Sequence, residues 1–369
     1  MASLWRWIGG ALLVAGALYL LAIGLTGLAI PWRPQPFDTA AATTTHPGWV
    51  NEGRYFLLNK HAFAAAGDRV VITGASTARD PFRPALIAAR LPGWEVANAS
   101  LSGAEIEEYR DLVDLYYADR RRGPGGRTIW VFAFSYMQFR PDGVPPGGEN
   151  PTATEAMRMG LYRRENGRLV PRYPDLVEQA LVAGLRPQAV EASLPNRIGR
   201  WLVYESGLPG MSALAARLRG DDQVRGWIDE LRHRDLDRVS IPPPVQAALL
   251  EHRLADVGGD TPSPAAQYAR FAALIERIRA EGDAVVLVDL PLPDWHLAAV
   301  RRSDVHHQAM LRRALGRFAD DPDVGYLSMR DLGDAENFFD SGHTEPRLWP
   351  VMSARLAEWL RAQPMVRAP

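Results

Sequence analysis

Short runs of apolar and β-branched residues recur along the chain and predict buried strands. They lie at 70–73, 94–98, 128–134, 283–290 and 324–328. In the runs at 128–134 and 283–290 nearly all residues are apolar, which is typical of parallel strands covered on both faces. Helical patterns lie between the runs, and each strand is therefore followed by a crossover helix. This alternation predicts a three-layer α/β/α fold around a five-stranded, mostly parallel sheet.

The alternation is interrupted between residues 141 and 282. Proline and glycine cluster at 141–151, and no strand-like run stands out between this cluster and residue 282. Helical patterns lie at 153–164, 174–183, 187–206, 221–236, 243–256 and 264–281. We therefore predict a helical insertion that caps the sheet, inside an α/β domain at 69–369 that comes after a linker and docking segment at 32–68.

An uncharged, apolar run occupies residues 8–30 and predicts an N-terminal anchor within residues 1–31. Its length is enough for a transmembrane helix. The alternative is a cleaved signal peptide, but the apolar region of such a peptide spans only about 7–15 residues. Arg6 precedes the run, which favours a cytoplasmic N-terminus. We expect a single-pass protein of the inner membrane with its domain outside the cytoplasm.

Composition excludes several classes of function. The net charge is −1 at pH 7, so the chain has no basic footprint for nucleic acid. It contains no cysteine, which excludes disulfides and thiolate metal sites. No motif for a metal or a cofactor stands out, and we expect neither.

The turn after the first strand is the first candidate for chemistry. Gly74-Ala75-Ser76 would present a hydroxyl at the carboxyl end of a parallel strand, where open α/β sheets bind ligands. A dinucleotide-binding turn of the short-chain dehydrogenase kind would need a downstream Tyr-x-x-x-Lys pair, but the chain's single lysine, Lys60, lies upstream. A hydrolase elbow would need several earlier strands, but little more than the N-terminal anchor and a linker comes before residue 70. Ser76 therefore remains as a candidate nucleophile.

A possible base lies in the last loop of the chain. Asp340 and His343 are three positions apart, just before the final helix. Acyl transfer through serine needs a base, a group that orients the base, and donors for the oxyanion. We predict Ser76 as nucleophile, His343 as base and Asp340 as orienter. Arg79 is a candidate for holding a phosphate or carboxylate, with a surface salt bridge as the alternative.

The order of four segments resembles the SGNH (GDSL-like) hydrolase superfamily. They are Gly74-Ala-Ser76, Asn98 to Gly103, Ser135-Tyr-Met-Gln-Phe139 and Asp340-Ser-Gly-His343. With the N-terminal run, the chain looks most like membrane-anchored D-alanine transfer proteins (DltD-like) and related polysaccharide O-acyl transfer proteins. The similarity covers 70–140 and 284–360. It implies a flavodoxin-like (SGNH) fold, with Gly103 as a backbone donor to the oxyanion.

The third of these segments departs from the family pattern. SGNH hydrolases have an asparagine donor here, but this chain has no Gly-x-Asn-Asp. The transfer proteins have Ser-Pro-Gln-Trp-Phe, and in this chain the glutamine is displaced by one position. Ser135 and Gln138 are the candidate substrate contacts here, with a capping role as the alternative for Gln138.

The resemblance implies a serine acyltransferase or esterase that acts in O-acylation, of the acetyl or D-alanyl class, of a cell-envelope polysaccharide or lipid. Its implied partner is a membrane-bound O-acyltransferase. Transfer and hydrolysis both remain open. The altered third segment keeps open a different class of function, namely a non-catalytic adaptor that binds the acyltransferase or a glycan.

Overall fold

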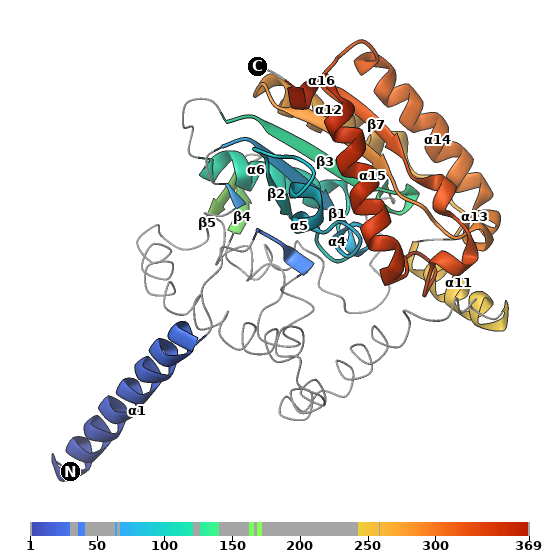
Figure 1. The fold of residues 1–369 in the computed structure, drawn as a ribbon. Coiled ribbons are helices and arrows are strands. Elements are labelled where there is room, and N and C mark those ends of the chain that lie inside the picture. The colour runs from blue at the N-terminus through green and yellow to red at the C-terminus, as the bar shows by residue number, and fades with distance from the viewer. Residues whose placement is uncertain are drawn as a thin grey trace.

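The computed structural model describes most of the α/β domain and several shorter segments. The described residues are 2–29, 36–40, 63–64, 67–120, 126–139, 162–165, 168–171, 243–257 and 259–367. Figure 1 shows the sheet enclosed between two layers of helices. The predicted helices at 174–183, 187–206 and 221–236 lie outside the described residues.

A parallel sheet forms the centre of the domain. Its strands are β1 (Arg69–Gly74), β2 (Glu95–Asn98), β3 (Thr128–Phe134), β6 (Ala284–Asp289) and β7 (Val324–Ser328). The five strands lie in the order β2-β1-β3-β6-β7, and all neighbours are parallel. This is the strand order of flavodoxin-like sheets. β2 is added on one side of β1, and the later strands are added on the other side. The predicted five-stranded sheet is confirmed.

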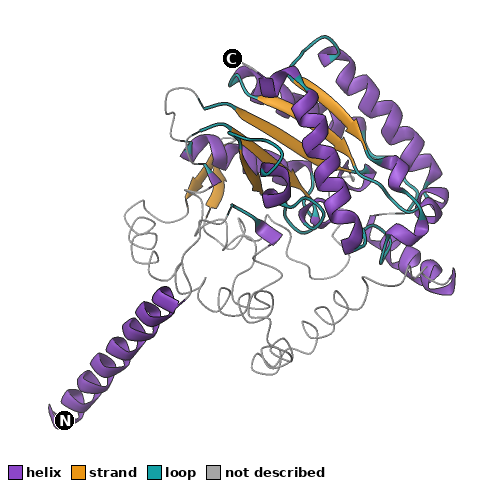
Figure 2. Cartoon of the chain, viewed as in Figure 1, coloured by secondary structure: helices purple, strands orange, loops and turns teal. Residues whose placement is uncertain are grey.

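Helices cover both faces of the sheet (Figure 2). On one face lie α6 (Ile106–Asp119), α12 (Ala265–Ala280) and α14 (Arg301–Leu315). On the other face lie α4 (Ser76–Arg79), α5 (Pro84–Ala88), α15 (Trp349–Ala362) and α16 (Pro364–Arg367). A short helix, α13 (Asp294–Ala299), comes after β6.

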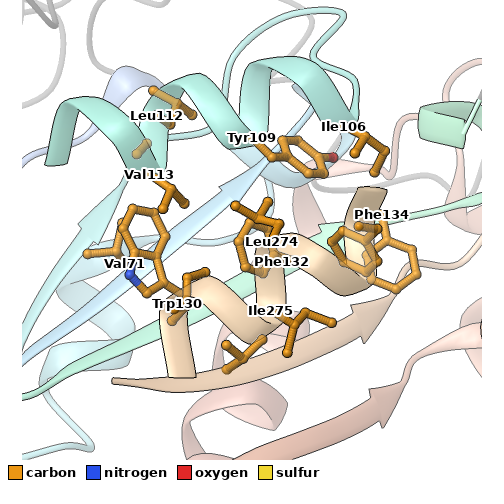
Figure 3. Packing of buried hydrophobic residues seen from close by; sticks show 14 of the residues in the cluster. Val71, Ile106, Tyr109, Leu112, Val113, Trp130, Phe132, Phe134, Leu274 and Ile275 are labelled. Carbon is orange, nitrogen blue, oxygen red and sulfur yellow. The ribbon is translucent and has the colours of Figure 1, made fainter. Parts of the chain in front are cut away.

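The two faces are filled by alternate residues of the same strands. Trp130, Phe132 and Phe134 of β3 pack toward α6 and α12, as Figure 3 shows. Ile129 and Val131 pack toward α15 on the other side. All residues of β3 are buried, because successive side chains of a strand point to opposite faces and both faces are covered. This explains the unbroken apolar runs in the sequence.

The insertion contains a hairpin that contradicts the expectation of helices alone. β4 (Tyr162–Glu165) pairs antiparallel with β5 (Arg168–Pro171). β4 overlaps the end of the helix expected at 153–164, so that prediction is wrong there. The signal for the hairpin is the Asn-Gly pair at 166–167, which favours a two-residue turn. The helices expected at 243–256 and 264–281 are confirmed as α11 (Pro243–Val257) and α12.

The N-terminal run forms the helix α1 (Ala2–Ala29), drawn apart from the sheet in Figure 1. Among the described residues, no helix combines the length and the apolar character needed to cross a membrane. The expected transmembrane helix is therefore not supported by the described part of the chain.

Part of the predicted linker packs against the edge of the sheet. Asp38 forms a parallel bridge with Asn98 at the end of β2. The Thr39 hydroxyl donates to the carbonyl oxygen of Ser100 at 2.5 Å, and the Phe37 side chain is only 4% exposed. Phe37, Thr39 and Ala40 are thus buried against the domain.

Candidate active site

Ser76 begins α4, shortly after the last residue of β1. A Cβ atom on Gly74 would lie 2.4 Å from the carbonyl oxygen of Ala133 and 2.4 Å from the Ala78 Cβ. Only glycine allows the chain to turn so close to β3. The turn is closed by the Arg79 amide, which donates to the Ala75 carbonyl oxygen at 2.9 Å. Ser76 is thereby held, half-buried, at the carboxyl end of β1.

The loop at 337–345 carries the predicted base, and we call it the catalytic loop after that predicted role. Phe338 pairs with Thr344 in an antiparallel bridge, and the Glu345 amide donates to the Asn337 carbonyl oxygen at 2.8 Å. These backbone bonds make the loop narrow and place residues 340–343 at its tip.

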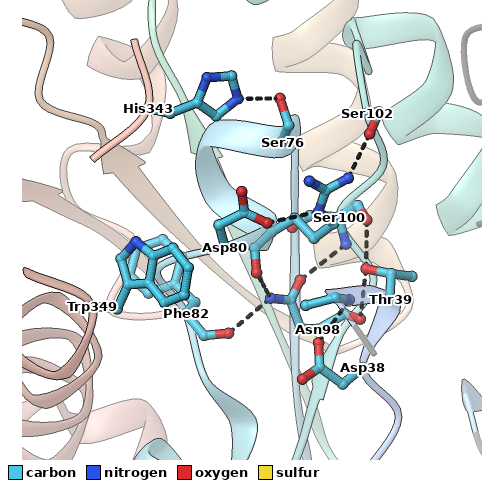
Figure 4. Close-up of polar contacts among 12 residues, drawn as sticks. Asp38, Thr39, Ser76, Asp80, Phe82, Asn98, Ser100, Ser102, His343 and Trp349 are labelled. Carbon is cyan, nitrogen blue, oxygen red and sulfur yellow. Dashed lines mark hydrogen bonds and ion pairs between the residues drawn. The ribbon is translucent and has the colours of Figure 1, made fainter. Parts of the chain in front are cut away.

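The tip of the catalytic loop reaches Ser76. His343 Nε2 lies 2.8 Å from Ser76 Oγ, and His343 Nδ1 lies 2.6 Å from Asp340 Oδ2. Because a carboxylate can only accept, Nδ1 carries the proton and Nε2 accepts from the serine hydroxyl. Figure 4 shows the imidazole of His343 directed at the hydroxyl. The structure therefore brings all three predicted triad residues together.

Asp340 is held in its ionised form by the loop itself. Its Oδ1 accepts hydrogen bonds from the backbone amides of Gly342 and His343, each at 2.7 Å. Burial raises the pKa of Asp340, but the charge and the hydrogen bonds of His343, with the Gly342 amide, outweigh burial and lower this pKa to about 2. Asp340 thus remains an acceptor for Nδ1–H at neutral pH and fixes the tautomer of His343.

Apolar groups surround the imidazole and the loop tip. The ring of Phe339 stacks on that of His343, with centroids 5.6 Å apart and planes inclined by 15°. A Cβ atom on Gly342 would lie 3.5 Å from the end of Met137 and 3.7 Å from the Thr77 methyl group. The hydrogen bond between His343 and Asp340 is strengthened in such surroundings, because water screens it less.

Gly103 lies in the loop after β2. Its φ of 66° is in the left-handed region, which favours glycine. The same loop is tied to the nucleophile turn, because the Leu101 amide donates to the Gly74 carbonyl oxygen at 2.9 Å and Arg79 Nη1 donates to Ser102 Oγ at 2.5 Å. Its role as an oxyanion donor remains a prediction.

Arg79 makes its contacts inside the protein. Its Nε donates to Asp80 Oδ1 at 2.8 Å, and the two side chains are 11% and 6% exposed. With the bond to Ser102, the guanidinium group ties α4 to the loop after β2 (Figure 4). These contacts favour a salt bridge over a ligand contact, although the pair is largely shielded from water and does not lie on the surface as expected.

Ser135 and Gln138 bond to each other. Gln138 Oε1 accepts from the Ser135 amide at 2.7 Å and from the Ser135 hydroxyl at 3.1 Å. Both side chains are buried, and the bonds close the short helix η1 (Tyr136–Phe139) after β3. The capping role for Gln138 thus has direct structural support.

The side-chain amide of Asn98 is also used within the fold. Its Nδ2 donates to the carbonyl oxygens of Arg79 at 2.9 Å and Phe82 at 2.8 Å, and its Oδ1 accepts from the Ser100 amide at 3.1 Å. Asn98 therefore joins the end of β2 to the segment after Ser76.

One residue beside the site is missing from the sequence prediction. His296, in α13, is fully buried, and its Nδ1 lies 2.5 Å from the carbonyl oxygen of Ser341 in the catalytic loop. The available signal was its position shortly after the strand at 283–290, because residues after parallel strands gather at one edge of the sheet.

Within the described ranges, no group of three or more His, Cys, Asp or Glu side chains is arranged to hold a metal ion. No protein-family model matches the sequence, and no curated protein matches it significantly. The geometry of the site must therefore carry the assignment of a function.

Proposed function

We propose that this protein is a serine acyltransferase or esterase of the SGNH type. The observation that carries the proposal is the continuous hydrogen-bonded chain from Ser76 Oγ through His343 to Asp340, with bonds of 2.8 and 2.6 Å. Acyl transfer through serine needs a nucleophile, a base and an orienter in this relation, and the hydrogen-bonded chain supports the proposal on that ground.

The reaction would proceed in two halves. Ser76 Oγ attacks the carbonyl carbon of an acyl ester or thioester while His343 Nε2 takes the hydroxyl proton. The leaving group then departs with that proton, and the acyl group remains on Ser76. In the second half His343 deprotonates an acceptor hydroxyl or water, which attacks the acyl-serine, and His343 then gives that proton to Ser76 Oγ as the bond between Oγ and the acyl carbon breaks. Asp340 stabilises the imidazolium form of His343 in both halves.

Backbone donors would have to stabilise the oxyanion. We propose the Gly103 amide for this role, since the loop that carries it is bonded to Gly74 and Arg79 of the nucleophile turn. Loss of one donor slows acyl transfer by about 100- to 1,000-fold. With no asparagine in the third segment, we expect a slow enzyme.

The substrate and the partner are proposed from the family resemblance. We propose an acyl group of the acetyl or D-alanyl class, an envelope polysaccharide or lipid as acceptor, and a membrane-bound O-acyltransferase as partner. The presence of such a partner would favour transfer over hydrolysis.

A non-catalytic adaptor is the second candidate function. It is favoured by the contacts of two side-chain amides near the site, which are used within the fold and not directed at an oxyanion. Asn98 Nδ2 donates to backbone oxygens, and Gln138 Oε1 accepts from Ser135. In this alternative the fold binds an acyltransferase or a glycan without turnover.

A fluorophosphonate probe separates the two candidates, because it reacts only with an activated serine. We expect the full-length protein to be labelled and Ser76→Ala to abolish labelling. In cells, Ser76→Ala should also reduce acylation of the envelope. An unlabelled wild-type protein, together with unchanged acylation in the Ser76→Ala strain, would favour the adaptor.

Location outside the cytoplasm is a separate part of the proposal. It is supported by the uncharged run at 8–30 and by the exposed apolar side chains of α1, among them Leu12 and Leu13. We expect a reporter that works only outside the cytoplasm to be active when it is fused after Pro369. Activity of a reporter that works only in the cytoplasm would refute this location.

A further inference from the structure

Ser341 lies between Asp340 and His343 in the catalytic loop, and both its carbonyl oxygen and its hydroxyl are hydrogen-bonded. Its carbonyl oxygen lies 2.5 Å from His296 Nδ1, and its hydroxyl accepts from Arg253 Nε of α11 at 3.2 Å. The Ser341 side chain is only 3% exposed. The loop is thus bonded to the body of the domain between Asp340 and His343.

The bonds of His296 determine its tautomer. A carbonyl oxygen can only accept, so Nδ1 of His296 carries a proton and donates it to Ser341. The hydroxyl of Tyr136 lies 2.8 Å from Nε2 and donates to it when the imidazole is neutral. Burial lowers the pKa of His296, which favours the neutral form. Tyr136 therefore reinforces the tautomer that holds the loop.

These three residues come from three different strand ends. Tyr136 lies after β3, His296 after β6, and Ser341 after β7. The Tyr136 and His296 rings meet edge to face, with centroids 5.8 Å apart and planes at 86°. Both side chains are buried, with exposures of 5% and 0%, so water does not compete for their hydrogen bonds.

We propose that His296, oriented by Tyr136, is a positioning residue that holds the catalytic loop at the distance His343 needs to activate Ser76. This inference rests on the proposed function. The bond acts on the backbone two positions before His343. A displacement of the base by about 1 Å is enough to cost about 100-fold in rate.

The chain provides a matched control in a second buried histidine–tyrosine pair. His307 of α14 is also fully buried, and its Nδ1 lies 3.0 Å from the Tyr268 hydroxyl. The His307 ring packs beside Phe139, on the face of the sheet that α6, α12 and α14 cover. Its contacts in the described part of the chain do not include the catalytic loop. Substitution of His307 therefore perturbs the core without releasing Ser341.

The test compares four variants of the full-length protein, namely His296→Leu, His296→Asn, Tyr136→Phe and His307→Leu. Leucine removes the donor to the Ser341 carbonyl oxygen. Asparagine preserves a donor, because its amide nitrogen can occupy nearly the same position as Nδ1 of histidine. The first readout is the rate of fluorophosphonate labelling as a function of probe concentration, which gives the maximal rate and the probe affinity separately. The second is the far-downfield proton resonance of the His343 Nδ1–H···Asp340 bond, which needs no turnover.

We expect His296→Leu to label about 100-fold more slowly at saturation, with unchanged probe affinity, and to lose or shift the resonance. His296→Asn should recover most of both signals. Tyr136→Phe should cause a smaller loss, and His307→Leu should lower thermal stability without changing either readout.

Wild-type rates and an unchanged resonance in a folded His296→Leu variant would overturn the inference, as would equal losses in His307→Leu. If His296→Leu does not fold, equal rates and resonances in Tyr136→Phe and wild type would overturn it instead. Absence of labelling in the wild type refutes the proposed function alone, because the resonance still decides whether His296 positions the loop.

Discussion

The Ser76 hydroxyl and His343 Nε2 lie 2.8 Å apart although 267 positions separate them in the sequence. Ser76 lies after β1, whereas the catalytic loop lies after β7 at the far edge of the sheet. The loop must therefore pass the ends of β6 and β3 to reach the nucleophile. The residues that hold it, His296 and Tyr136, come from these two strand ends.

Replacement of Asp340 by asparagine should reduce activity far more than it changes the fold. Asparagine can donate to His343 Nδ1, which stabilises the wrong tautomer, and the rate of acyl transfer should fall by about 10,000-fold. The measurement is the labelling rate at saturating fluorophosphonate. Asp331→Asn is the matched control, because Asp331 is 60% exposed and pairs with Arg355 on the surface. Equal rates for Asp340→Asn and Asp331→Asn would contradict the triad.

The low pKa of Asp340 predicts a dependence of stability on pH. Its pKa falls from 3.8 to about 2 on folding, so the unfolded chain binds more protons between these values. The ionised group therefore contributes about 2 kcal/mol at pH above about 4, and this contribution is lost as the pH falls toward 2. Urea unfolding at several pH values should show that, as the pH falls, the free energy of unfolding of the wild type decreases by this amount more than that of Asp340→Asn. Parallel curves for the two proteins between pH 5 and pH 2 would refute it.

The strands of the sheet and the individual candidates Ser76, Asp340 and His343 could be predicted because their signals are local, whereas the pairing of Ser76 with His343 is inferred from the order of distant segments. Consecutive apolar residues predict strands buried on both faces, and the three-position spacing of Asp340 and His343 lies within one loop. Ser76 could be singled out because a glycine turn comes directly after its strand. In each case the residues that decide the structure are neighbours in the sequence.

The contacts that hold the site could not be predicted, because they join distant segments. His296 and Arg253 reach Ser341 across 45 and 88 positions. A buried histidine has no periodic pattern that marks its partner. The roles of Arg79 and Gln138 were open for the same reason, since a side chain that binds a ligand and one that bonds to a neighbouring loop look alike in sequence.

The close approach of Gly74 to β3 predicts a large effect of one added methyl group. In Gly74→Ala the new Cβ would meet the Ala133 carbonyl oxygen at 2.4 Å, and overpacking of this kind costs about 1–3 kcal/mol. Gly316→Ala is the control, because its Cβ meets nothing within 4 Å and its φ is −54°. Chemical denaturation should show a loss for Gly74→Ala only. An equally stable Gly74→Ala protein would show that the turn can move away from β3.

The left-handed backbone of Gly103 allows its proposed role to be separated from its conformation. Gly103→Ala and Gly282→Ala both place a side chain at positive φ, at 66° and 83°, and each should lose about 1–2 kcal/mol of stability. Only Gly103→Ala should also label more slowly, by at least about 10-fold, because its amide shifts away from the oxyanion. The same labelling rate in both variants would remove Gly103 from the site.

The paired contacts of Gln138 predict a loss of stability when its side chain is made apolar. Gln138→Leu leaves the buried amide of Ser135 without its acceptor, which costs about 1–3 kcal/mol. The control is Gln363→Leu, whose wild-type side chain donates at 3.3 Å to the Trp359 carbonyl oxygen and is only partly buried. Thermal unfolding should therefore separate the two variants by several degrees. If Gln138→Leu instead unfolds like the wild type and weakens only the binding of substrate, then its amide contacts substrate and the capping bond is dispensable.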